Sequence, residues 1–160
     1  MGVEIEKKFL LANDNWRQQV TKQVQFCQGY LLGSEKSSVR VRIEGDKSNL
    51  NIKGATLGVR RQEFEYPIPM EDAKDLLATL CAEPLIEKTR HYIYAGEHVW
   101  EIDEFDGDNK GLIVAEVELK DENDTFEHPE WLGQEVSHDK RYYNSMLIKN
   151  PYKSWKDQAV

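Results

Sequence analysis

The sequence has few cysteines and no long hydrophobic run. Cys27 and Cys81 are its two cysteines, and their separation does not match a metal-binding motif. One disulfide and two free thiols are both compatible with this pair, and the sequence favours two isolated, buried thiols. No apolar stretch approaches the length of a membrane span, and the N-terminal residues show no signal-peptide pattern. We therefore expect a soluble, cytoplasmic protein without a membrane partner.

The sequence also lacks excess positive charge and a large hydrophobic share. The net charge is −8 at pH 7, which argues against nucleic acid as a partner. Any anionic ligand must therefore be held by a local cluster of Lys and Arg. Charged residues make up 31% of the chain, so many of them should be functional or well solvated. There is no internal repeat, low-complexity tract or linker, and residues 1–160 are predicted to form a single domain.

The N-terminal residues predict a strand with one charged face. Residues 3–10 read VEIEKKFL, and side chains on a strand alternate with a period of two. Glu4, Glu6 and Lys8 therefore share one face, and apolar residues dominate the other. A single strand of this kind usually turns its charges to solvent. The pattern becomes informative because it recurs along the chain.

Alternation of this kind defines the predicted fold. We predict strands at residues 3–10, 24–32, 39–43, 49–53, 59–68, 85–95, 99–105 and 112–120. Helices are predicted from about Asn13, at residues 71–81 and in the tail, with a short helical turn at residues 129–132. Most strands follow one another as hairpins, and eight strands are enough to close a barrel. The fold class is therefore mainly β (α+β): a closed eight-stranded antiparallel β-barrel with a few flanking helices.

The charges on the strand faces segregate by sign. Predicted strands 39–43, 49–53 and 85–95 carry bases in phase, whereas 99–105 and 112–120 carry acids in phase. Adjacent like charges repel unless a ligand neutralises them, which a polyanion would do for the bases and divalent cations for the acids. The apolar faces would also fill an ordinary barrel core, and periodicity leaves that alternative open. The amphipathic helices need an apolar surface to lie on, which favours a tunnel with a charged interior.

These motifs, in this order, resemble the CYTH superfamily, the triphosphate tunnel metalloenzymes. Glu4-x-Glu6-x-Lys8 is similar to the family's ExExK signature, and the resemblance covers nearly the whole chain. The other matching motifs are Gln28-Gly29-Tyr30-Leu31, Val39-Arg40-Val41-Arg42, Ile52-Lys53-Gly54, Glu63-x-Glu65, Glu87-Lys88-x-Arg90, Trp100-Glu101-x-Asp103-Glu104-Phe105, Ala115-Glu116-Val117-Glu118-Leu119 and Asp139-Lys140-Arg141-Tyr142-x-Asn144-Ser145. The resemblance implies a triphosphate-containing small molecule as substrate and Mg²⁺ or Mn²⁺ as cofactor. The small bacterial members imply hydrolysis of inorganic triphosphate to pyrophosphate and phosphate.

Candidate roles follow from this resemblance and from side-chain chemistry. Arg and Lys suit the oxygens of a triphosphate, and carboxylates suit hard cations. The candidate substrate-binding residues are Lys8, Arg40, Arg42, Lys53, Arg61, Lys88, Arg90 and, as a lid donor, Arg141. The candidate metal ligands are Glu4, Glu6, Asp103, Glu116 and Glu118, and the candidate catalytic residues are Lys8, Tyr30 and Glu6. Ordinary salt bridges are the alternative for the bases, and a structural role is the alternative for Tyr30.

Several alternatives stay open on the sequence alone. A class IV-type adenylate cyclase, or a nucleoside or thiamine triphosphatase, would use the same charged walls. The cyclase ranks lower because no purine-specific motif is visible. A noncatalytic polyphosphate-binding module would need the bases but no turnover. An uncovered apolar barrel face could support a homodimer, so the oligomeric state is also open.

Overall fold

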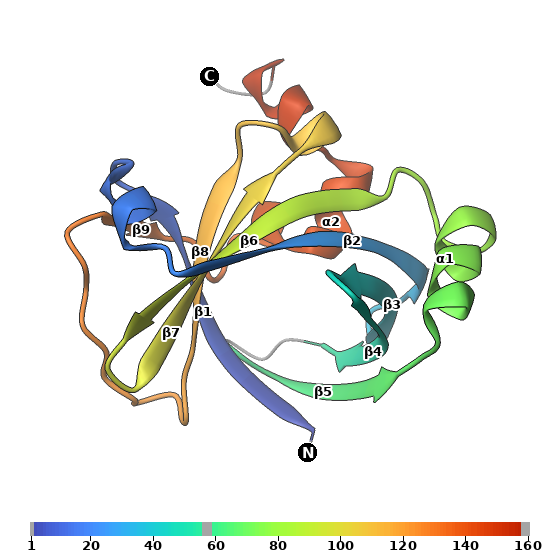
Figure 1. Cartoon of the computed structure of the whole chain (residues 1–160), viewed down its shortest axis with the longest axis horizontal. Coiled ribbons are helices and arrows are strands. Elements are labelled where there is room, and N and C mark those ends of the chain that lie inside the picture. The colour runs from blue at the N-terminus through green and yellow to red at the C-terminus, as the bar shows by residue number, and fades with distance from the viewer. Residues whose placement is uncertain (1, 56–58, 158–160) are drawn as a thin grey trace.

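The computed structural model describes residues 2–55 and 59–157 (Figure 1). Its strands are β1 (Val3–Leu11), β2 (Lys22–Gly33), β3 (Ser37–Glu44), β4 (Lys47–Gly54), β5 (Arg60–Pro67), β6 (Ile86–Ala95), β7 (His98–Phe105), β8 (Ile113–Glu118) and β9 (Leu132–Glu135). The α-helices of the described residues are α1 (Met70–Thr79) and α2 (Asn144–Lys149). Short 3₁₀ helices occupy Asn15–Gln19, Gly107–Asn109, Lys140–Tyr142 and Tyr152–Asp157. None of these helices is long and apolar enough to cross a bilayer.

The first eight strands form a closed antiparallel barrel. They follow the order β5-β4-β3-β2-β6-β7-β8-β1, and pairing between β1 and β5 closes the circle. The predicted eight-stranded antiparallel barrel is therefore confirmed. Closure places side chains of alternate residues inside the barrel and the others outside.

Strand β1 is shared among three partners, and this sharing sets the register of the site. Residues Val3–Ile5 pair with β5, Glu6–Phe9 pair with β8, and the end of β1 pairs with β9. Figure 1 shows β1 running from the labelled N-terminus, near β5, to the middle of the view, where β8 is labelled. The register places Lys8 opposite Glu116 and Glu6 opposite Glu118, so charges from the two ends of the barrel sequence meet.

Strand β9 is an addition that the sequence patterns did not predict, and the short helical turn predicted at residues 129–132 is a single hydrogen-bonded turn. A single turn, in which the Leu132 N–H donates to the Pro129 carbonyl at 3.0 Å, leads directly into β9. With four residues, β9 is too short to show a clear alternation. Gly133 is needed there because a Cβ would lie 2.8 Å from the Leu10 carbonyl oxygen.

The hydrophobic core lies outside the barrel wall, which reverses the arrangement of an ordinary small barrel. One cluster packs around Trp100 and is covered by Trp16 and Trp131. A second packs under the C-terminal residues, including Leu147 and Trp155. The third lies under α1, where Cys27 and Cys81 are free, half-buried thiols. Most of the outer apolar surface is thus covered, although Phe64 and Tyr66 of β5 stay exposed, and the predicted charged interior is confirmed.

Candidate active site

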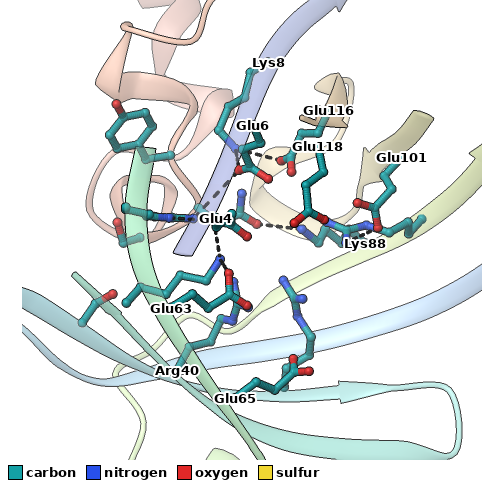
Figure 2. Close-up of a pocket in the computed structure, with 18 of the residues that line it drawn as sticks. Glu4, Glu6, Lys8, Arg40, Glu63, Glu65, Lys88, Glu101, Glu116 and Glu118 are labelled. Carbon is teal, nitrogen blue, oxygen red and sulfur yellow. Dashed lines mark hydrogen bonds and ion pairs between the residues drawn. The ribbon is translucent and has the colours of Figure 1, made fainter. Parts of the chain in front are cut away.

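The barrel interior contains a cavity of about 330 Å³ to which every barrel strand contributes (Figure 2). Figure 2 shows the labelled acids and bases pointing from several strands into a common space. The cavity brings together most of the predicted site residues: Glu4, Glu6, Lys8, Tyr30, Arg40, Arg42, Lys53, Arg61, Lys88, Arg90, Glu116 and Glu118. These residues are far apart in the sequence, and the barrel closure makes them neighbours.

Lys88, Arg90 and Arg42 form a basic wall with more positive than negative charge. Lys88 Nζ lies 2.7 Å from Asp103 Oδ2, and Arg90 Nε lies 2.7 Å from Asp103 Oδ1. Arg42 Nε donates instead to the neutral amide oxygen of Gln28, at 2.8 Å. These bases are almost fully buried, and Lys88 is 1% exposed.

Burial and the neighbouring positive charges lower two pKa values in the basic wall. Burial lowers the pKa of Lys88 to about 7, with Arg90 and Arg42 adding to the effect against the opposing pull of Asp103. Burial, assisted by the neighbouring Arg40 and Arg90, lowers the pKa of Arg42 to about 9. A cation with a depressed pKa is one whose charged form lacks compensation. An anion bound beside these residues would supply that compensation.

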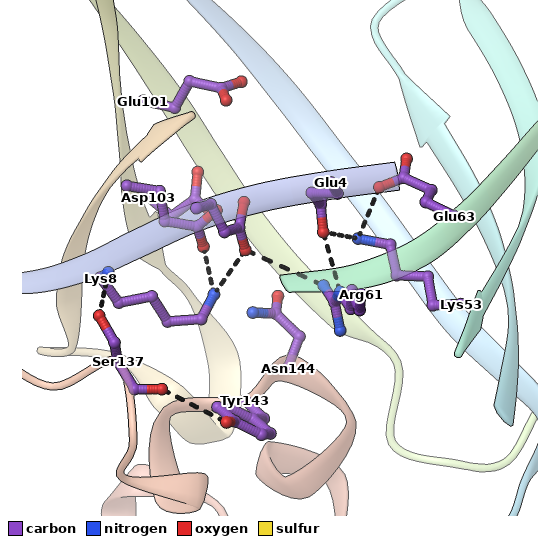
Figure 3. Close-up of polar contacts among 12 residues, drawn as sticks. Glu4, Lys8, Lys53, Arg61, Glu63, Glu101, Asp103, Ser137, Tyr143 and Asn144 are labelled. Atoms are coloured by element: carbon purple, nitrogen blue, oxygen red, sulfur yellow. Dashed lines mark hydrogen bonds and ion pairs between the residues drawn. The ribbon is translucent and has the colours of Figure 1, made fainter. Parts of the chain in front are cut away.

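A second group of ion pairs joins β1, β4 and β5 (Figure 3). Arg61 Nε lies 2.8 Å from Glu4 Oε1, and Lys53 Nζ lies 3.4 Å from the same oxygen. Lys53 also lies 3.5 Å from Glu63 Oε2, so Glu63 supports a base. Burial, together with Arg40 and Arg61, lowers the pKa of Lys53 to about 8 despite these carboxylates.

Lys8 differs from Lys53 and Lys88, because negative charge dominates its surroundings and it lies between two acids. Its Nζ is 2.8 Å from Glu116 Oε1 and 3.3 Å from Glu6 Oε1. Burial would lower the pKa of Lys8, but Glu116 and Glu6 outweigh it and raise that pKa. Lys8 therefore remains a fixed cation across the neutral range. Tyr30 lines the same cavity, although in the described part of the chain the Lys8 ammonium bonds only to these two acids.

The remaining acids crowd one another. Burial and Glu116 raise the pKa of Glu6, and burial followed by Glu4 and Glu101 raises the pKa of Glu118. Burial also raises the pKa of Glu101, despite the opposing effect of Arg90. Crowded carboxylates with raised pKa values gain stability when a hard divalent cation joins them, and oxygen is the ligand that Mg²⁺ and Mn²⁺ prefer.

The donor set therefore fits such a cation by its chemistry. Among residues 2–55 and 59–157, no three acidic, His or Cys side chains already converge as a complete metal site. Glu4 and Glu6 are instead bonded to Arg61 and Lys8. Cation binding would thus exchange some of these ion pairs for metal–oxygen contacts.

Asp103 and Arg141, both predicted as site residues, lie outside the cavity lining. Asp103 is 0% exposed, and both of its oxygens accept hydrogen bonds from Lys88 and Arg90, so it supports the basic wall from behind. Arg141 lies at the surface, where its Nη2 is 2.7 Å from Asp139 Oδ2 and its guanidinium is 5.1 Å from the Trp155 ring centroid. This geometry favours a surface salt bridge over the predicted role of Arg141 as a lid donor.

The C-terminal segment, defined as residues 137–145, adds lining residues that the sequence did not assign. Ser137, Tyr143, Asn144 and Ser145 all border the cavity. The Lys8 backbone N–H donates to Ser137 Oγ at 3.0 Å, and the Tyr143 hydroxyl donates to the Ser137 carbonyl at 3.3 Å. Their one sequence signal is that Asn144 and Ser145 belong to the last motif of the family resemblance. That signal identifies the segment without giving a role.

The chain is similar to known proteins over nearly its whole length. Residues 2–146 match the CYTH domain. The chain is 47% identical over 157 residues to an inorganic triphosphatase from Acetivibrio thermocellus, covering 98% of this chain and 100% of that protein. It is 34% identical over 151 residues to an inorganic triphosphatase from Nitrosomonas europaea, covering 90% of this chain and 95% of that protein.

Solved structures share the architecture. The crystal structure of an inorganic triphosphatase superimposes with a TM-score of 0.64 at 30% identity, covering 91% of this chain and 93% of that chain. A putative adenylyl cyclase from Hippeastrum, described as having a dominant triphosphatase activity, superimposes with a TM-score of 0.57 at 13% identity. That alignment covers 76% of this chain and 80% of the plant chain. At this identity, the second likeness concerns the fold alone.

Proposed function

Because this chain belongs to the CYTH domain family, we propose that it hydrolyses inorganic triphosphate to pyrophosphate and phosphate inside its charged tunnel. The relatives named above are inorganic triphosphatases that match it over nearly their whole length. The proposed cofactor is Mg²⁺ or Mn²⁺.

The observation that carries the proposal is the uncompensated positive charge of the buried bases. Lys88 and Arg42 have lowered pKa values although the charge of Asp103 opposes the shift of both. A linear triphosphate presents several charged oxygens along its length, and this wall presents several buried donors. Arg is suited to grip two such oxygens at once. We assign substrate binding to Arg40, Arg42, Lys53, Arg61, Lys88 and Arg90, together with Lys8.

The acids would hold the cation. We propose Glu4, Glu6, Glu116 and Glu118 as its ligands, whereas Asp103 is already saturated by Lys88 and Arg90. When bound, a divalent cation supplies neutralisation of phosphate charge and lowers the pKa of coordinated water.

The chain's own residues would position the substrate and move one proton. Water attacks the terminal phosphorus, the bond from that phosphorus to the bridging oxygen breaks, and pyrophosphate leaves with the electron pair. Glu6 is the proposed general base, because its carboxylate lines the cavity in which the substrate would lie. Lys8 stays protonated beside it and stabilises charge on the transferred group, while Tyr30 orients the substrate. Phosphoryl transfer has a loose transition state, so positioning and electrostatics should dominate the rate.

The test is phosphate release from tripolyphosphate in the presence of Mg²⁺ or Mn²⁺. We expect Glu4→Gln and Glu6→Gln each to lower kcat/KM by about 100-fold, since each removes a charge from the cation and proton-transfer apparatus. Glu97→Gln is the matched control, because the Glu97 side chain is 82% exposed and is not one of the residues that line the cavity. Full activity in both tunnel variants contradicts the assignment.

The same assay with other substrates separates the related activities. ATP and thiamine triphosphate, each with both cations, test a nucleoside or thiamine triphosphatase, and cyclic AMP formation from ATP tests a cyclase. Tripolyphosphate binding without turnover under either cation would identify a noncatalytic binding module. Phosphate release that is fastest from tripolyphosphate supports the proposal.

A further inference from the structure

Asn144, the first residue of α2, is a neutral residue of the tunnel whose amide oxygen accepts two hydrogen bonds, while its amide nitrogen makes none within the described residues. It borders the cavity together with Lys88, Arg42 and Arg90. In Figure 3 its side chain projects from the C-terminal segment toward the tunnel, between Lys8 and Arg61 in that view. No role for it follows from the sequence or from the relatives' names.

Hydrogen-bond chemistry fixes the orientation of this amide. The Arg42 Nε–H can only donate, so the Gln28 amide oxygen faces it, at 2.8 Å. The Gln28 amide nitrogen then faces Asn144 and donates to its Oδ1 at 2.9 Å. Gln28 itself is 0% exposed, so this arrangement is enclosed by protein.

Lys88 imposes the same orientation independently. Its ammonium has donors only, and Nζ lies 2.9 Å from Asn144 Oδ1. Two donors from two different strands therefore converge on the one amide oxygen. The Asn144 amide nitrogen must be the other end of the group, and within the described residues it makes no hydrogen bond.

We infer that the Asn144 amide nitrogen is a further ligand for the triphosphate, and that its amide oxygen positions Lys88 and Gln28. This inference rests on the proposed function, since it names a donor for the same substrate. A free N–H group beside three buried cations meets a phosphate oxygen held by those cations. Unlike an ammonium, an amide donates along a fixed direction, so Asn144 adds orientation to the charge of the wall.

The position of Asn144 depends on the residues that follow it in the chain, and not on the barrel alone. Leu147 of α2 and Trp155 pack in the apolar cluster outside the barrel, together with Ile86 and Phe105. This packing holds the start of α2 against the tunnel. The segment thereby supplies a substrate ligand to a cavity whose other donors come from strands.

The experiment measures tripolyphosphate binding by calorimetry in EDTA, so that no divalent cation contributes. We expect Asn144→Ala to weaken binding about tenfold, the usual effect of removing a hydrogen bond to a charged group. Asn144→Asp keeps an acceptor oxygen for Lys88 and Gln28 but replaces the N–H donor with a carboxylate oxygen. It should therefore weaken binding at least as much. Met146→Leu, at an exposed position of α2, is the matched control and should bind as wild type does.

Two results would overturn the inference. Wild-type affinity of Asn144→Asp for tripolyphosphate would show that neither the lost N–H donor nor the added carboxylate lies near the substrate. Wild-type affinity in Asn144→Ala overturns it as well. Thermal melts identify a variant that has lost its fold, and the other substitution then decides. A wild-type protein that binds tripolyphosphate without hydrolysing it would contradict the proposed function but would leave the Asn144 contact testable by the same titration.

Discussion

The ammonium nitrogen of Lys8 lies 2.8 Å from a carboxylate oxygen of Glu116, and the two residues are paired across β1 and β8. Both side chains are nearly buried, so each compensates a charge that water cannot reach. The pair thus links the closure of the barrel to the electrostatics of the site. Lys8 holds the pKa of Glu116 well below its usual range against the effect of burial, and Arg90 assists.

Removing only Lys8 should destabilise the protein and abolish activity. Lys8→Met leaves Glu116 and Glu6 without their shared partner, and breaking a buried pair on one side typically costs about 3 kcal/mol. Urea denaturation measures this loss. The double variant Lys8→Met/Glu116→Leu removes both charges and should recover most of the stability while staying inactive in the phosphate-release assay. Activity in the double variant would contradict the role of Lys8 in the reaction.

Stability of the ligand-free protein should increase between pH 7 and pH 9. The pKa of Lys88 is about 7 in the folded protein and 10.5 ordinarily. Between these values the unfolded chain binds a proton that the folded chain does not, so the free energy of unfolding rises with pH. Lys53 and Arg42, whose pKa values are also lowered, contribute with the same sign. Urea denaturation at the two pH values should show a gain of about 2 kcal/mol.

Lys88→Met provides the control for that pH dependence. It removes the titrating group, so the gain between pH 7 and pH 9 should shrink, whereas Lys120→Met, whose ammonium-bearing side chain is 76% exposed, should leave it unchanged. Binding of tripolyphosphate to the wild type at pH 8 should take up protons, because an anion favours the charged lysine. An undiminished pH effect in Lys88→Met would show that other groups cause it.

Replacing Arg90 by Ala should weaken tripolyphosphate binding much more than replacing Arg141 by Ala. Arg90→Ala removes a donor from the cavity and leaves Asp103 with Lys88 alone, so tripolyphosphate affinity in EDTA should fall more than tenfold. Arg141→Ala removes a surface ion pair, and such pairs contribute about 0–1 kcal/mol. Its affinity should stay within about twofold of wild type. A loss as large as that of Arg90→Ala would show that Arg141 reaches the substrate.

Gly133→Ala should weaken the attachment of β9 to β1. The added Cβ would lie 2.8 Å from the Leu10 carbonyl oxygen, which is backbone and cannot rotate away. We expect a loss of about 1–3 kcal/mol in urea denaturation, as for other overpacked sites. Gly33→Ala is the matched control at a strand end, since a Cβ there meets no atom within 4 Å. Equal stability of the two variants would contradict the close approach.

The local part of the fold was predictable because strand alternation is a property of neighbouring residues. Arg40 with Arg42 and Glu116 with Glu118 share strand faces wherever those strands lie. The pairing of Lys8 with Glu116 is not local, because it depends on β1 lying beside β8 when the barrel closes. Strand β9 was not predictable in this way, because its four residues carry little periodic signal and its position depends on Gly133 fitting against β1.

Alternation predicts on which face of a strand a side chain lies, but not how deeply the side chain is buried. Asp103 shares the phase of Glu101, yet it lies behind the basic wall because Lys88 and Arg90 both bond to it. Asn144 and Ser137 enter the cavity from a segment that has no strand period, so their positions depend on packing. Arg141 and Asn144 are three residues apart, and one lies at the surface while the other borders the tunnel.

The sequence by itself determined which charges share a face, because the geometry of an extended chain is local and repeats every two residues. Whether that face turned inward was decided by tertiary structure. The apolar faces are buried outside the barrel wall, under Trp16, Trp131, α1 and the C-terminal residues. The charged faces therefore point into the barrel. Closing the barrel then brought buried charges of both signs within bonding distance, and burial together with these neighbours shifts the pKa values of Lys8, Lys53 and Lys88.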